Sequence, residues 1–301
     1  MSLHRFSAIT ASLTFVLLVM GGLVHNTRSS LACPYWPLCY GSLLPKIEGG
    51  ILIEHSHRIV ATTVGLLTIV LLVWLWRRGM KWLGIAALAC VIAQGVLGGL
   101  TVIYRLPTMV STAHLAVSQL FFCILLYIVL RTRTAVAPSP LPDNVRRMTA
   151  WAAGLVYAQM LVGALMRHLG AGLACTEIPL CRGSAWPAGA VPALQLHMFH
   201  RLFALLVLGY VIGTAIVTFR AARGRTVVRA LAVAAPLLVV VQITLGLYSI
   251  TSFLDVVPVT AHLGVAALLL ADLVSLHLIA RGPLGVRAPA ADGPYAAPVT
   301  T

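Results

Sequence analysis

Eight stretches of this chain are apolar and long enough to cross the roughly 30 Å hydrocarbon core of a membrane as helices. Only 9% of the 301 residues are charged, and the mean hydropathy is +0.97, which excludes a soluble domain because such a domain exposes far more charge. We predict an all-α integral membrane protein with eight transmembrane helices, the first of them retained rather than cleaved. The predicted spans cover residues 7–25, 51–76, 82–103, 108–130, 148–168, 193–219, 226–250 and 257–280.

The positive charge of the chain is distributed unevenly between the two sides of the predicted membrane. The net charge is +14, and of the 21 basic residues 14 fall on one side, leaving 7 for the other side and the outer helix ends. Basic residues collect on the cytoplasmic side of membrane proteins, so the charge does not indicate a nucleic-acid partner. We predict a multi-pass protein of the cell membrane, embedded in the lipid bilayer, with both termini in the cytoplasm. The 14 residues are Arg5, Arg77, Arg78, Lys81, Arg131, Arg133, Arg146, Arg147, Arg220, Arg223, Arg225, Arg229, Arg281 and Arg287.

The sequence contains an internal repeat. Residues 31–41 and 173–183 share the pattern Leu-Ala-Cys, then Pro-Leu-Cys, then Gly, at a constant offset of 142 residues. Because four spans separate equivalent points, the halves have the same orientation, and we predict two pseudo-twofold-related four-helix bundles. The predicted divisions are an N-terminal bundle over 1–130, a cytoplasmic linker over 131–147, a C-terminal bundle over 148–281 and a disordered tail over 282–301.

Four histidines occupy equivalent places in the two halves. His57 and His200 lie in His-Arg dipeptides 143 residues apart, and His114 and His262 lie in Thr-Ala-His tripeptides 148 residues apart. Ionisable residues inside a membrane are costly and usually functional. A single such histidine is more often a hydrogen-bonded link between helices, and a metal without porphyrin is also possible. Four duplicated histidines at similar depth favour two imidazoles facing a haem iron in each half.

Charged residues beside the first two histidines suggest further roles. Arg58 and Arg201 follow the candidate ligands directly, where a guanidinium would pair with a haem propionate or reach the lipid headgroups. Glu54 lies one helical turn before His57, whereas the equivalent position of the second half is His197. Glu54 is either an ion-pair partner of an arginine or an acid/base group at the first-half site.

Each half also carries a cysteine pair in a predicted external loop. Cys33 and Cys39, and likewise Cys175 and Cys181, are spaced as C-x5-C. In an oxidising compartment such pairs persist as disulfides, so we predict one small closed loop in each half. A zinc site would need further ligands, and neither loop supplies an obvious set.

These motifs together resemble the haem A synthase family. The resemblance rests on Glu54-x-x-His57-Arg58, on the two cysteine loops and on the two Thr-Ala-His segments ending at His114 and His262, and it covers about residues 7–280. Two departures concern the loops: Tyr35 stands where an aspartate is common, and residues 176–178 replace the usual Pro-Asp-Trp.

The resemblance implies an enzyme that converts haem O to haem A for cytochrome oxidase by oxidising one ring methyl to a formyl group. It implies that His200 and His262 ligate a resident haem b, and that His57 and His114 flank the haem O substrate with assistance from Glu54. Haem O synthase and an electron donor are the implied partners. The alternative classes are a non-enzymatic dihaem b-type electron carrier and a haem transporter.

Overall fold

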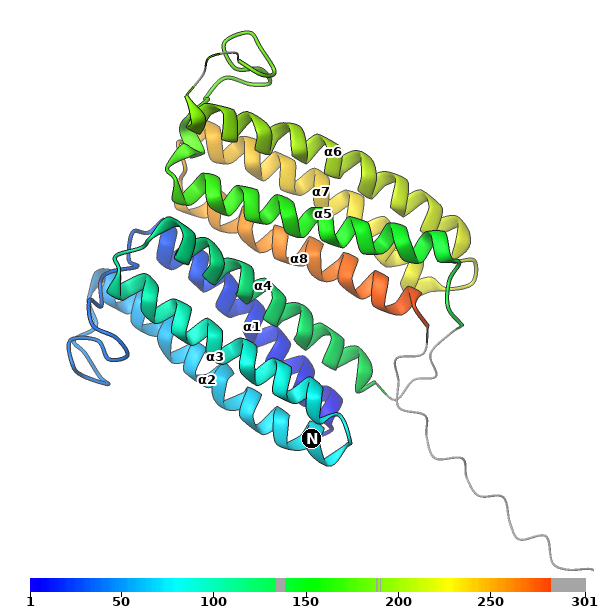
Figure 1. Ribbon diagram of the computed structural model, residues 1–301, viewed down its shortest axis with the longest axis horizontal. Helices are drawn as coiled ribbons and strands as arrows, with labels where there is room; N and C mark the ends of the chain where they lie inside the picture. Colours follow the sequence, from blue (N-terminus) through cyan, green and yellow to red (C-terminus); the bar gives the residue numbers. More distant parts are fainter. Residues whose placement is uncertain (134–138, 188, 190, 283–301) are drawn as a thin grey trace, which may run out of the picture.

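The computed structural model describes residues 1–133, 139–187, 189 and 191–282, and within them it is helical (Figure 1). The eight long helices are α1 (Leu3–Asn26), α2 (Gly49–Arg77), α3 (Lys81–Ile103), α4 (Thr108–Arg131), α5 (Asp143–His168), α6 (Pro192–Ala221), α7 (Thr226–Thr251) and α8 (Val256–Ala280). A short 3₁₀ turn, η1 (Ala171–Leu173), follows α5. All eight are long and apolar enough to cross a membrane, and the described residues form no β-strand, so the predicted all-α class and span count are confirmed.

These segments form helices because a helix satisfies its own backbone hydrogen bonds, which hydrocarbon cannot do. The few hydroxyl side chains within the spans follow the same rule. Thr68 donates to the carbonyl of Val64 at 2.7 Å, and Thr214 donates to the carbonyl of Tyr210 at 2.8 Å. These hydrogen bonds satisfy hydroxyl groups within a single helix, while the buried cores between the helices consist mainly of apolar side chains.

The helices form two groups of four (Figure 1). In the first group α1 contacts α2 and α4, and α3 contacts the same two helices; α5 to α8 repeat this ring. Leu71 and Leu125 are fully buried in the first group, and Leu270 and Leu273 are buried in the second. The pseudo-twofold relation between the groups remains a prediction.

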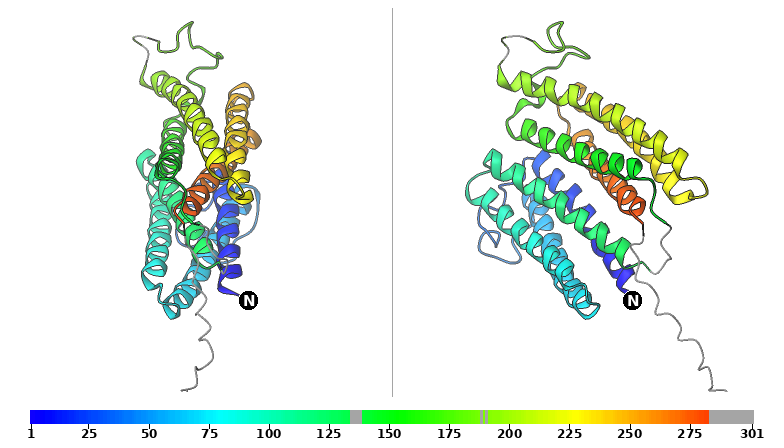
Figure 2. Two further views of the ribbon diagram at one scale, coloured as in Figure 1. Left: turned by 90° about the vertical axis from the view of Figure 1, so that its right-hand side faces the viewer. Right: turned by 45° about the vertical axis from the view of Figure 1, so that its right-hand side comes forward.

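The two groups meet along α1 and α4 on one side and α5 and α8 on the other. Figure 2 shows these helices between the outer pairs of each group. The contact includes polar side chains: Asn26 donates to the hydroxyl of Thr260 at 3.0 Å, and the rings of His25 and His168 meet edge to face with centroids 5.1 Å apart. His25 and His168 thus link the halves.

The connections lie as the repeat predicts. The links α1–α2, α3–α4, α5–α6 and α7–α8 all lie at one end of the helices, and the two longest of them carry the cysteine pairs. The predicted linker 131–147 contains the first turn of α5, which begins at Asp143. The predicted tail 282–301 lies almost wholly outside the described residues.

Candidate functional site

The four candidate histidines occupy matching places on their helices. His57 and His200 each lie eight residues after the first residue of α2 and α6 (57−49 and 200−192), and His114 and His262 each lie six after that of α4 and α8 (114−108 and 262−256). At 1.5 Å per residue these are depths of about 12 Å and about 9 Å. The paired helices flank the same two neighbours, so each half presents two imidazoles at similar depth from helices on opposite sides of the bundle.

Each of the four histidine rings packs against a glycine on the preceding helix. A Cβ atom at that glycine would lie 3.0 to 3.3 Å from the histidine Cε1 atom, a separation that few real side chains tolerate. The preceding helix therefore leaves room for the imidazole only because it carries no side chain there. The pairs are His57 with Gly21, His114 with Gly98, His200 with Gly163 and His262 with Gly246.

Glutamines one turn before two of these glycines hold the histidine backbone. The side-chain amide of Gln94 donates to the carbonyl oxygen of His114 at 2.9 Å, and Gln159 makes the same 2.9 Å contact with His200. The amide nitrogen of Gln159 also lies 3.1 Å from Nδ1 of His200. Both histidines are therefore fixed in position by a neighbouring helix.

The other two histidines differ from each other. Nδ1 of His262 lies 3.0 Å from the backbone carbonyl oxygen of Gln242, so the ring donates its Nδ1 proton and leaves Nε2 free to bind a metal. Near His57, Leu17 stands one turn before the glycine, where the other three helices have glutamine. Nδ1 of His57 is buried and has no hydrogen-bond partner among the described residues.

This arrangement suits haem better than a bare metal ion. Neither histidine pair belongs to a group of three or more histidine, cysteine or carboxylate ligands in the described part of the chain. Haem supplies four nitrogens of its own and needs only two axial ligands. The buried Nδ1 atoms of His57 and His114 have no hydrogen-bond partner among the described residues, so these histidines fit the role of haem ligands.

Arg58 and Arg201 hold the cysteine loops against the helices. The guanidinium of Arg58 donates to the carbonyl oxygens of Cys33 and Tyr35, both at 2.7 Å, and Arg201 donates to those of Cys175 and Glu177, also both at 2.7 Å. The sequence did not reveal this contact, because it joins residues more than 20 positions apart. Contact of either arginine with a haem propionate remains a prediction.

Glu54 is buried, with 3% of its surface exposed. Its Oε1 lies 2.5 Å from Nη2 of Arg58, and its Oε2 accepts a hydrogen bond from the backbone N–H of Cys33 at 2.7 Å. His197, the equivalent residue, instead lies with Nδ1 3.0 Å from the carbonyl oxygen of Ala171. The ion pair considered from the sequence is therefore present, and only the first half has a carboxylate here.

Both cysteine pairs are joined as the sequence predicted, Cys33 to Cys39 and Cys175 to Cys181. The first cysteine loop packs against α3 at a glycine, and the second loop has no equivalent glycine on α7. A Cβ atom at Gly99 would lie 2.8 Å from the ring of Trp36, so this indole rests directly on α3, at the residue after the glycine that contacts His114. The equivalent residue on α7 is Leu247.

The chain matches known proteins along most of its length. Residues 4–274 match the model of the COX15-CtaA family, described as cytochrome oxidase assembly proteins. The chain belongs to this family. It is 32% identical to a heme A synthase of Shouchella clausii over 270 residues, which are 83% of this chain and 87% of the relative. It is 31% identical to a heme A synthase of Alkalihalophilus pseudofirmus over 258 residues, covering 81% and 86% of the two chains.

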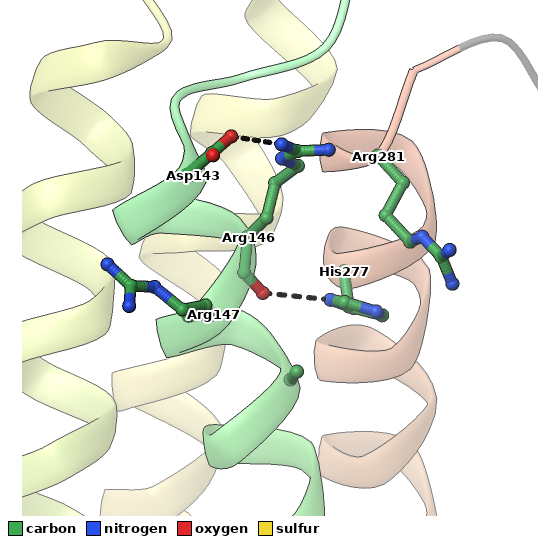
Figure 3. A pocket seen from close by; sticks show the side chains of 6 residues that line it. Asp143, Arg146, Arg147, His277 and Arg281 are labelled. Atoms are coloured by element: carbon green, nitrogen blue, oxygen red, sulfur yellow. Dashed lines mark hydrogen bonds and ion pairs between the residues drawn. The ribbon is translucent and has the colours of Figure 1, made fainter.

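This member of the COX15-CtaA family also has a cavity at the opposite end of the helices from the cysteine loops. The cavity has a volume of about 470 Å³ and lies between α5 and α8 (Figure 3). Within it Arg146 pairs with Asp143, and Nδ1 of His277 lies 3.1 Å from the carbonyl oxygen of Arg146. None of the four candidate histidines lines it; its residues are Asp143, Arg146, Arg147, Ala150, His277 and Arg281.

In this COX15-CtaA member the sequence indicates the four histidines, whereas the residues that position them are identified in the structure. The signal was present: Gln-x-x-x-Gly occurs at 94–98, 159–163 and 242–246, each time on the helix before a candidate histidine. The contact of Trp36 with Gly99 has no such signal in the sequence. The two residues are 63 positions apart (99−36), and the equivalent residues of the second half are Ile178 and Leu247.

Proposed function

We propose that this chain is a haem A synthase, which oxidises one ring methyl of haem O to a formyl group and so provides haem A for cytochrome oxidase. One observation carries the proposal: two pairs of membrane histidines in the same helical register, in a chain whose relatives are named heme A synthase.

The two halves divide the work in this proposal. Residues 1–130 form the substrate half, in which His57 and His114 flank haem O. Residues 148–281 form the half in which His200 and His262 hold a resident haem b, joined to the first by the segment 131–147. The hydrogen bond from His262 to the Gln242 carbonyl supports a ligand role, because it fixes the tautomer that presents Nε2. A bound haem b supplies one-electron transfer; the protein supplies its position and its surroundings.

Glu54 is the proposed proton acceptor of the substrate half. Conversion of a methyl to a formyl group is a four-electron oxidation that passes through a hydroxymethyl group and releases protons with the electrons. The carboxylate lies one helical turn from His57 and is buried, so it is placed to accept or relay those protons. Its contacts with Arg58 and with the backbone N–H of Cys33 fix the orientation of the carboxylate.

The proposed setting is the cell membrane, with both termini in the cytoplasm and the haem sites towards the outer face. The distribution of basic residues and the disulfides at the end nearest the four histidines support this orientation. Haem O synthase is the proposed source of substrate, and an electron donor is a further proposed partner. Arg58 and Arg201 lie at the same end, and each is proposed to pair with a haem propionate.

The alternative functions are a non-enzymatic dihaem electron carrier and a haem transporter. Two equivalent electron-carrying haems require similar surroundings, whereas the halves differ at Glu54 against His197 and at Leu17 against Gln159. These differences favour one catalytic half and one supporting half.

The test is expression of the full chain in a host that makes haem O but lacks a haem A synthase of its own. Haems extracted from the membranes are separated by chromatography and identified by mass. We expect haem A in cells that express the chain and haem O alone in cells with an empty vector. Haem O alone in both, with the chain present in the membrane and loaded with haem b, would contradict the proposed function.

A further inference from the structure

His55 lies beside the first disulfide and has no other visible partner. It is buried, with 8% of its surface exposed, and both ring nitrogens are buried without a hydrogen-bond partner among the described residues. A ring nitrogen of His55 and the sulfurs of Cys33 and Cys39 all lie within 4.8 Å of one another. Burying a polar ring without a hydrogen bond costs folding free energy, so a buried imidazole in this state indicates a role for its nitrogens.

The three side chains together are a donor set for a soft or borderline metal ion. We propose that, once the Cys33–Cys39 disulfide is reduced, the two thiolates and His55 bind one Zn²⁺ ion. Two cysteines and one histidine with an open fourth position form a known type of zinc site. Thiolate sulfurs around tetrahedral zinc lie about 3.8 Å apart, which follows from Zn–S bonds of about 2.3 Å. The two sulfurs are bonded to each other in the disulfide, so after reduction they must separate to reach this distance, while a ring nitrogen of His55 already lies within 4.8 Å of both.

The chemistry balances without any unnamed reagent. A dithiol reductant gives two electrons and two protons to the disulfide, which becomes two thiols while the dithiol becomes a disulfide. Zn²⁺ then displaces both thiol protons to water and takes the neutral imidazole as its third protein ligand. The disulfide and the zinc site exclude each other, so the metal binds in the reduced state only.

The second half lacks the third ligand. The residue equivalent to His55 at an offset of 143 is Met198, which packs with Cys175, Cys181 and Leu194 in an apolar cluster. Zinc sites in proteins use cysteine, histidine and carboxylate ligands rather than thioethers. The second disulfide therefore serves as an internal control for the first, because only the first has an imidazole beside it.

A cavity of about 240 Å³ adjoins the first site, and His55 is one of its lining residues together with Leu38 and Ser42 of the loop. Cys33 and Cys39 do not line this cavity and are fully buried. Arg58 also lines it, but both of its terminal nitrogens donate to loop carbonyls or to Glu54.

The test uses the full-length, haem-loaded protein in detergent. One sample is reduced with a dithiol, which is removed on a desalting column, and one is left oxidised. Both are then mixed with a small excess of Zn²⁺ and passed over a second desalting column. Zinc per chain is measured by mass spectrometry of the element, and thiol alkylation reports which cysteines are open. We expect about one zinc per reduced chain, none per oxidised chain, and slower alkylation of Cys33 and Cys39 when zinc is present.

Three variants separate the explanations. His55→Met copies the second half and should abolish zinc retention, as should Cys33→Ser; Cys175→Ser removes the second pair and should leave retention unchanged. Haem absorbance serves as the measure of folding, and His55→Asn repeats the test if His55→Met fails to retain haem. Zinc retention in the oxidised protein, retention unchanged by loss of His55, or a first pair that cannot be reduced in the folded protein would each overturn the proposal.

Discussion

Glu54 holds the first cysteine loop and also lies one turn from His57, so its charge and its shape need to be tested separately. Glu54→Gln keeps an oxygen that accepts the Cys33 N–H but removes the charge that pairs with Arg58. We expect haem A formation to fall by about 10²-fold or more, as when an acid/base group is lost, with haem O or its hydroxymethyl form accumulating and haem b retained. Chromatography of extracted haems measures all of these.

Glu48→Gln is the matched control for that change. Glu48 pairs with Lys46 at 2.5 Å at the exposed start of α2, so its loss should leave haem A formation unchanged. If Glu54→Gln formed haem A at the parent rate, Glu54 would be a loop contact only, and the asymmetry between Glu54 and His197 would have no catalytic meaning.

At the scale of the helices, the glycines beside the histidines make a second prediction. In Gly246→Ala the new Cβ atom would lie 3.1 Å from Cε1 of His262, so the ring must turn or shift. We expect the overpacking to lower the free energy of unfolding by about 1–3 kcal/mol and to change the absorption spectrum of the haem proposed for the second half. Gly209→Ala is the control, because its Cβ atom would meet no atom within 4 Å. Identical spectra in the two variants would show that the glycine does not position His262.

The contact between the first loop and α3 makes a third prediction. Gly99→Leu introduces the residue found at the equivalent position of α7 and displaces the ring of Trp36, which lies 2.8 Å from the Cβ position. We expect the loop to loosen over the substrate half, with lower haem A formation and unchanged haem b. Gly95→Ala, one turn earlier and in open space, should have no effect. Equal haem A formation in both variants would show that the contact of Trp36 with Gly99 is not needed for activity.

The helices could be predicted almost completely from the sequence, whereas the contacts around the site could not. Hydropathy alone located all eight spans, since each must be apolar over its whole length. The roles of Arg58 and Arg201 as loop anchors depend on how the loop folds back over α2 and α6, which no local pattern records. The position of His55 beside the first disulfide has no local signal either, because Cys33 and Cys39 lie 22 and 16 positions earlier (55−33 and 55−39).

At the scale of the whole molecule, the repeat explains both what the halves share and where they differ. Shared features are the helical register of the histidines, the glycines beside them, the arginine anchors and the disulfides. The first half differs from the second at Glu54, His55, Leu17 and the contact of Trp36 with Gly99. The chain is thus a duplicated bundle in which the first copy alone has a carboxylate beside its histidines and a loop packed on α3.

The division of labour between the halves is tested most directly by counting haems in two variants, His57→Ala and His262→Ala. Each is produced in the host that makes haem O, purified, and analysed for bound haem b, haem O and haem A by extraction and chromatography. We predict that His262→Ala loses haem b, whereas His57→Ala keeps haem b and forms no haem A. Loss of haem b from His57→Ala with its retention in His262→Ala, or haem A formation by His57→Ala at the parent rate, would contradict the account.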